Sequence, residues 1–151
     1  MIHRSGYKNI WLCIISLSLL TTGCKFPDDP DHTLSKIENS HTIKIGICSC
    51  QQNEIQSREK SLLISLANTL HARIIWVADN QEALYRSLEA KKIDIMACNI
   101  QKDSPWNERV ALSIPYEEKP VTRQKHVFAL PSGENAWLKY INEFIYRGRK
   151  I

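Results

Sequence analysis

The sequence has no apolar run long enough to cross a membrane, no internal repeat and no large block of like charge. A membrane-spanning helix needs about 20 apolar residues, and the run at residues 10–20 is shorter and contains two serines. The formal charge of +4 is spread along the chain, except for a basic C-terminus at residues 147–150, so nothing indicates nucleic-acid binding. We expect this basic end to close a helix or to contact anionic lipid.

Sequence motifs of catalysis are absent as well. There is no P-loop and no Ser/His/Asp set, and His41, His71 and His126 lack the spacing of metal ligands. The adjacent carboxylates Glu117 and Glu118 are expected to form a solvated turn rather than an acid/base pair. The sequence therefore predicts a non-catalytic protein without a cofactor.

The N-terminus has the order of a bacterial export signal. Basic residues precede the apolar run at residues 10–20, and small residues ending in Gly23-Cys24 follow it. This ending resembles a lipobox, in which cleavage before the cysteine leaves Cys24 to receive lipid; an ordinary signal peptide with a chance cysteine is the alternative. We expect a signal peptide at residues 1–23 and a lipid-anchored protein on the periplasmic side of the cell envelope. Lys25 favours the outer membrane if the source is Gram-negative.

The mature chain divides into a tether and one domain. Residues 24–33 contain two prolines and three aspartates with little to bury, which is typical of a flexible segment. Residues 34–151 are enough for a single domain with a real core.

Apolar periodicity predicts strands that alternate with helices along this domain. The strands are expected at residues 42–48, 73–77, 93–97 and 126–130. The helices are expected from Ser57, from Asn80, from Pro105 to about Ala111, and from about Ser132 to the C-terminal region. This alternation predicts an α/β fold with a mostly parallel sheet of about four to five strands and helices on both faces. Ligands of such sheets bind outside the carboxyl ends of the strands, where Ser49, Asn99 and Gln101 are expected.

The segments "TIKIGI", "SLLISLANTLHARIIWV", "LEAKKIDIMACNIQKDSPWNERVALSIPY" and "HVFALPSGENAWLKYINEFI" follow one another in an order that resembles the bacterial extracellular solute-binding proteins of family 3. These proteins serve amino-acid uptake by ABC transporters and have a periplasmic-binding-protein fold of two lobes. The most specific part is residues 94–116, in which the family's Phe-Ser-x-Pro-Tyr motif falls on residues 112–116.

Two departures from the family affect function. After the Pro-Tyr pair the family builds a second lobe, but here only residues 117–125 separate Tyr116 from the returning strand. The resemblance therefore implies a single lobe that offers half a ligand site. The family's arginine, which clamps the ligand carboxylate, aligns with Trp106, so this clamp is expected to be lost.

The resemblance implies a set of ligand-binding residues at the open edge of the lobe: Ser49, Asn99, Gln101, Trp106, Arg109 and Tyr116. Gln101 aligns with the Ser/Thr that binds the ligand carboxylate in the family, and Asn99 with the glycine or serine two residues before it; both side chains can hydrogen-bond a ligand. Trp106 supplies a stacking face or a cation–π contact, or alternatively caps the open face or contacts a partner protein. Arg109 either turns into the cleft or stays exposed on its helix.

Three cysteines remain in the domain. In the family's sheet, the strands that end at Cys48 and Cys98 are adjacent and parallel, so the resemblance implies a Cys48–Cys98 disulfide. Cys50 is then free at the rim, or is the alternative partner of Cys98. A thiolate site for Cu(I) or zinc formed by all three is another reading, although an exported protein favours the disulfide.

The sequence thus predicts a lipid-anchored, solute-binding-like lobe that holds a small polar or aromatic solute weakly, as a component of an ABC transporter. The alternative is a non-transporting interaction or sensory module with a vestigial site, which presents its open face to an envelope protein or to a second copy. An enzyme is a third reading, because some relatives are dehydratases, but no matching catalytic residues are found.

Overall fold

The computed structural model describes residues 29–49, 54–118 and 123–149. The predicted signal peptide, the lipidation site Cys24 and the rim cysteine Cys50 lie outside these residues. The elements are α2 (Thr33–Ser40), β1 (Thr42–Cys48), α3 (Glu54–Thr69), β2 (Arg73–Asp79), α4 (Gln81–Glu89), β3 (Ile95–Gln101), the 3-10 helix η2 (Pro105–Glu108), β4 (Ala111–Leu112), β5 (Glu117–Glu118), β6 (Lys125–Leu130) and α5 (Asn135–Gly148). None of the described helices combines the length and the apolar composition that a membrane span requires.

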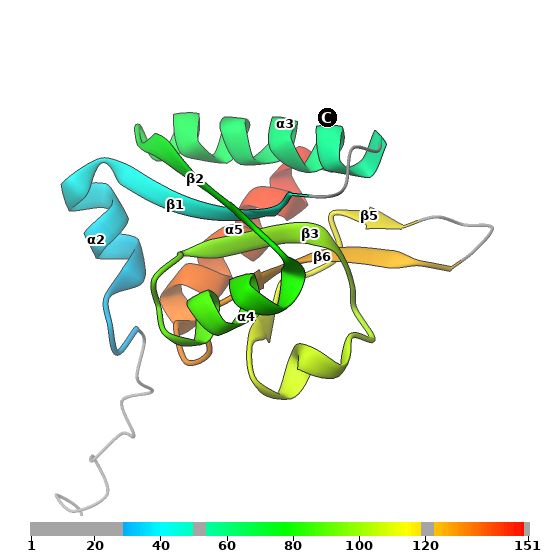
Figure 1. Cartoon of the computed structure of the whole chain (residues 1–151). Coiled ribbons are helices and arrows are strands. Elements are labelled where there is room, and N and C mark those ends of the chain that lie inside the picture. Colours follow the sequence, from blue (N-terminus) through cyan, green and yellow to red (C-terminus); the bar gives the residue numbers. More distant parts are fainter. Residues whose placement is uncertain (1–28, 50–53, 119–122, 150–151) are drawn as a thin grey trace, which may run out of the picture.

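The strands form one sheet in the order β2-β1-β3-β6-β4, with β5 also paired to β6 (Figure 1). The predicted α/β lobe is confirmed, and β1 is parallel to both β2 and β3. The sheet as a whole is mixed rather than mostly parallel, because β6 is antiparallel to β3, β4 and β5. Only residues 119–124 connect β5 to β6, and a parallel connection needs a dozen or more residues, so this pair closes as a hairpin.

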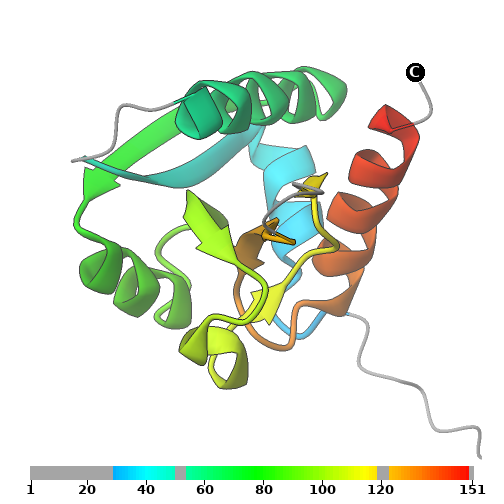
Figure 2. The same cartoon turned by 90° about the vertical axis from the view of Figure 1, so that its right-hand side faces the viewer.

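Helices cover both faces of the sheet, as predicted (Figure 2). Successive strand residues point to opposite faces, so each strand contributes to two cores. On one face Ile45, Ala97 and Phe128 pack with residues of α2, α3 and α5. On the other face Met96 and Val127 pack with residues of α4.

Residues 29–33, which belong to the segment predicted to be a tether, contact the rest of the lobe. Asp29 and Thr33 are buried. The backbone N–H groups of Asp31 and Thr33 donate to the Glu134 carboxylate, both at 3.1 Å, and Glu134 is itself 1% exposed. This external carboxylate satisfies amides at the start of α2, a helix that the sequence pattern did not predict. Residues 29–33 are therefore packed against the lobe through Glu134.

Candidate functional site

Asn99 and Gln101 belong to β3 itself, which ends at Gln101, four residues beyond the predicted end at residue 97. Asn99 has a φ of 53°, a left-handed conformation that asparagine tolerates better than most residues. It lies where the β3–β6 register shifts between Met96 and Ile100. Because of this irregularity the N–H of Asn99 leaves the sheet ladder and donates to Glu59 Oε1 on α3, at 2.9 Å.

Glu59, on α3, is a buried acidic residue at this edge and is 1% exposed. Its Oε1 atom accepts hydrogen bonds from the Asn99 N–H and from the Tyr116 hydroxyl, the latter at 2.7 Å. Burial raises the pKa of Glu59, and the charge of Glu117 adds to this effect, whereas the two hydrogen bonds oppose it. Burial next to Glu59 also raises the pKa of Tyr116, so the tyrosine stays protonated and remains a donor.

Around Glu59 lies a group that we call the Glu59 cluster: Arg58, Glu59, Asn99, Tyr116 and Glu117. Within it, Glu59 Oε2, Asn99 Oδ1 and Glu117 Oε2 are buried oxygen atoms without a hydrogen-bond donor among the described residues. The only cation is Arg58, whose Nη1 binds Glu117 Oε1 at 2.9 Å. Burying acceptors without donors is unfavourable, so this cluster favours a group that carries several N–H donors and positive charge.

Sequence reasoning missed Glu59, although a signal exists. Glu59 precedes Leu63, Leu66 and Leu70 by four, seven and eleven residues, which puts a carboxylate on the apolar face of α3. A charged residue in that register is a candidate for a role other than solvation.

Trp106 lies on η2 and is half-buried. Its ring contacts two side chains of the protein itself. Its ring stacks on Tyr85 of α4, with ring centroids 4.4 Å apart and planes at 9°. The Arg109 guanidinium lies 5.2 Å from the centre of the Trp106 ring, and its Nε binds Glu89 Oε1 at 2.6 Å. Arg109 is therefore held against α4 by Glu89, and the stacking surface of Trp106 is shared with Tyr85.

The other two predicted ligand residues, Ser49 and Gln101, have contacts of their own, away from the Glu59 cluster and from Trp106 and Arg109. Ser49 is exposed, and its N–H donates to the carbonyl of Asp79 at 3.0 Å. Gln101 pairs with His126 and lines an open polar cavity of about 530 Å³ together with cations that include Arg123. The structure thus joins Asn99 with Tyr116, and Trp106 with Arg109, but it does not bring all six residues into one site.

Cys48 and Cys98 form a disulfide between the ends of β1 and β3, with Cα atoms 5.2 Å apart. Ile45 is level with Ile95 in the parallel register, which brings the two cysteines level three residues later. Both are 3% exposed on the α4 face of the sheet. No group of three or more metal-binding side chains occurs among residues 29–49, 54–118 and 123–149.

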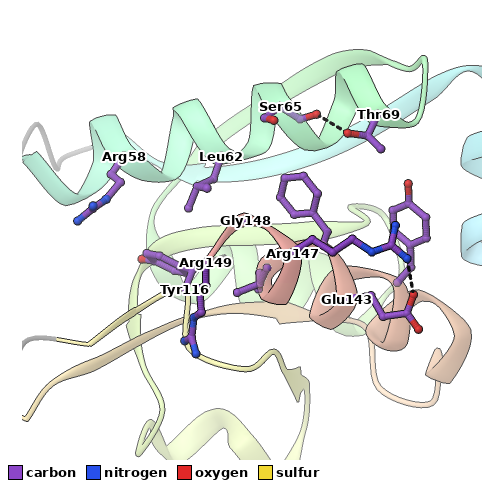
Figure 3. A pocket seen from close by; sticks show the side chains of 12 residues that line it. Arg58, Leu62, Ser65, Thr69, Tyr116, Glu143, Arg147, Gly148 and Arg149 are labelled. Atoms are coloured by element: carbon purple, nitrogen blue, oxygen red, sulfur yellow. Dashed lines mark hydrogen bonds and ion pairs between the residues drawn. The ribbon is translucent and has the colours of Figure 1, made fainter. Parts of the chain in front are cut away.

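A second cavity of about 540 Å³ lies between α3 and α5 (Figure 3). Its wall includes Leu62 and Phe144, and its charged residues are mainly the arginines Arg58, Arg147 and Arg149. Tyr116 is the one predicted ligand residue that lines it. Because of its arginines this cavity suits an anionic or apolar group, not a cation.

Comparison with known proteins gives matches in structure only. No family model matches the chain, and no curated protein matches it by sequence. A point mutant of domain 1 of the arginine-binding protein from T. maritima, in its arginine-bound form, aligns with 78% of this chain and 99% of that chain, at 19% identity and a TM-score of 0.70.

Two further structures have the same fold. An amino-acid ABC transporter substrate-binding protein from Streptococcus pneumoniae, bound to L-arginine, aligns with 78% of this chain and 92% of that chain, at 8% identity and a TM-score of 0.67. An ancestral cyclohexadienyl dehydratase aligns with 78% of this chain and 90% of that chain, at 12% identity and a TM-score of 0.66, so proteins of this fold include enzymes. The chain has the fold of one lobe of an amino-acid-binding protein.

Proposed function

We propose that this chain is a lipid-anchored, non-catalytic solute-binding lobe of the bacterial envelope, and that it takes a small cationic solute at the Glu59 cluster. The observation that carries the proposal is the set of three buried oxygen acceptors without donors, on Glu59, Asn99 and Glu117. They lie at the sheet edge where ligands of parallel α/β sheets bind.

A guanidinium or ammonium group complements this cluster in two ways. Its N–H groups supply the missing donors, and its charge stabilises the ionised form of Glu59, which burial disfavours. Since Glu59 is 1% exposed, neighbouring side chains must move for the solute to reach Oε2. The solute then gives the carboxylate a charged donor, and hydrogen bonds of this kind are the stronger ones.

The carboxylate of an amino acid should contribute little to binding. Trp106 stands where the family has its clamping arginine, and Arg109 already binds Glu89. The arginine-bound form of an isolated domain 1 supports the idea that one lobe can retain a ligand. We therefore expect arginine and agmatine, its analogue without the carboxylate, to bind with similar affinity.

A thermal-unfolding screen of the soluble chain from Lys25 tests this proposal. Arginine and agmatine should raise the melting temperature, because a ligand that binds only the native state stabilises it by mass action, whereas glutarate should not. Glu59→Gln keeps the size of the side chain and its acceptor for Asn99 and Tyr116, and it should abolish the shift. An unchanged melting temperature with both cations, or an equal shift in Glu59→Gln, would contradict the proposal.

The membrane attachment has its own test. The proposed lipid on Cys24 predicts that the exported protein partitions into the detergent phase, and that Cys24→Ser yields an uncleaved or soluble form. Identical partitioning of the two forms would contradict the proposed lipid anchor and the role as a membrane-bound transporter component. It would not affect the proposal of cation binding.

A second candidate function, a non-transporting interaction or sensory module, is favoured by the contacts of Trp106. With Tyr85 stacked on it and Arg109 over it, the ring is less available for an aromatic solute. Such a module should show no stabilisation by any solute in the screen, yet should retain an envelope protein in a pull-down.

A further inference from the structure

β2 is an edge strand of the sheet, and no described strand pairs with its outer side (Figure 2). It pairs with β1 along all of Arg73–Asp79 without a register shift, so its outer side is a regular seven-residue edge. Ile75 and Trp76 on this strand are 37% and 38% exposed. A long, regular edge with exposed large apolar residues is a template for pairing with another strand.

Two backbone hydrogen bonds define which residues face outward. The N–H of Arg73 donates to His41, and the carbonyl of Asp79 accepts from Ser49. These two residues therefore direct their backbone groups inward to β1 and its ends. Because the groups alternate along a strand, Ile74, Trp76 and Ala78 direct their N–H and C=O groups to the open side.

We infer that β2 pairs antiparallel with β2 of a second copy of this chain, about a two-fold axis that passes beside Trp76. In this register Ile74 lies opposite Ala78 of the second copy and the two Trp76 residues face each other. These are the residues with outward backbone groups, as the hydrogen-bonded pairs of an antiparallel ladder require. The two sheets become one continuous sheet.

The side chains fit the same register. Arg73 falls opposite Asp79 of the second copy, in a non-hydrogen-bonded pair, where side chains approach most closely. The two-fold axis repeats this ion pair at the other end of the strand, and the exposed Ile75 meets Val77 between them. A register shifted by two residues keeps the backbone pattern but places Arg73 opposite Val77 or beyond the strand, so charge selects the symmetric pairing.

The strand lacks the usual protection against such pairing. Edge strands are commonly guarded by lysine, proline or a bulge, and residues 74–78 contain none of these. Lipid anchoring would place copies in one plane and raise their effective concentration. The inference does not depend on cation binding, since the Glu59 cluster lies at the carboxyl end of β3 and not on β2.

Charge reversal tests the pairing and its register together. Arg73→Asp alone places two acidic pairs across the interface, and Asp79→Arg alone places two basic pairs, so each variant should raise the dimer dissociation constant by about tenfold or more. Mixing the two variants should restore association as a heterodimer, because both of its pairs are again opposite in charge. Sedimentation of the chain from Lys25 measures all three samples.

A monomeric wild-type chain, or single variants that associate as the wild type does, would overturn the inference. Association that the single variants lose but their mixture does not regain would overturn the register. Asp79 also accepts the N–H of Asn80 at 2.7 Å, so thermal unfolding should first establish that Asp79→Arg is folded. If it is not, Trp76→Lys replaces it: like charges at the axis should leave a monomer, and a dimer of Trp76→Lys would refute pairing through β2.

Discussion

Breaking the Cys48–Cys98 disulfide should lower the free energy of unfolding of the domain by about 2–4 kcal/mol. The bond joins residues 50 positions apart, and closing a loop of this length in the unfolded chain corresponds to about 4 kcal/mol in the chain-entropy model. Both cysteines are 3% exposed in the apolar cluster under α4, so the reduced thiols keep most of their packing. The loss should therefore come mainly from the greater freedom of the unfolded chain.

The measurement is urea unfolding of a Cys50→Ser variant with and without reductant, since the substitution prevents thiol exchange with Cys50. The urea midpoint should fall on reduction, while the native circular dichroism spectrum stays the same. Peptide mapping of the oxidised wild-type chain from Lys25 should find Cys48 linked to Cys98 and one free thiol at Cys50. An unchanged midpoint, a Cys50–Cys98 link or stoichiometric metal on the three thiols would refute this reasoning.

Three smaller changes probe the packing and the titrating groups. Gly46→Ala should destabilise the domain by about 1–3 kcal/mol in urea unfolding, because a Cβ there would lie 2.6 Å from Ile93 Cδ1. Burial and a neighbouring carboxylate raise the pKa of Asp29 to about 6, so its contribution to stability is full at pH below its usual value and is lost as pH rises through about 6. Asp29→Asn should flatten this part of the stability–pH curve, and an unaltered curve would argue against the shift. Tyr116→Phe removes the 2.7 Å hydrogen bond to Glu59 and should raise the pKa of Glu59 further, at a stability loss of about 1.5–3 kcal/mol, measured by carboxyl NMR titration and urea unfolding.

Local periodicity predicted most of the elements but not how the strands are paired. The isoleucines of β1 recur with the period of a strand and the leucines of α3 with that of a helix, so the sequence predicts both elements. The direction of β6 depends on its neighbours in the sheet, and no residue of β6 encodes it alone. The α2 helix was missed because its start is stabilised by Glu134, about a hundred residues further along the chain.

Two residues of the Glu59 cluster, Asn99 and Tyr116, were named from the sequence, but Glu59, which joins them, was not. Resemblance placed Asn99 and Tyr116 at the sheet edge, where the structure joins them through Glu59. It also placed Trp106 there, but the stacking partner Tyr85 comes from α4, and sequence spacing does not reveal a contact between separate elements. The half-buried ring is therefore explained by packing that only the fold creates.

Calorimetric titration of the chain from Lys25 with agmatine, as a function of pH, tests the central claim most directly. Since burial raises the pKa of Glu59 and a bound cation favours its ionised form, affinity should increase as the pH rises through the pKa of Glu59, with release of a proton at the acidic end. Glu59→Gln should bind agmatine weakly, without this pH dependence. Tight binding that is the same in the wild type and in Glu59→Gln at every pH, or no binding to the wild type at all, would contradict the account.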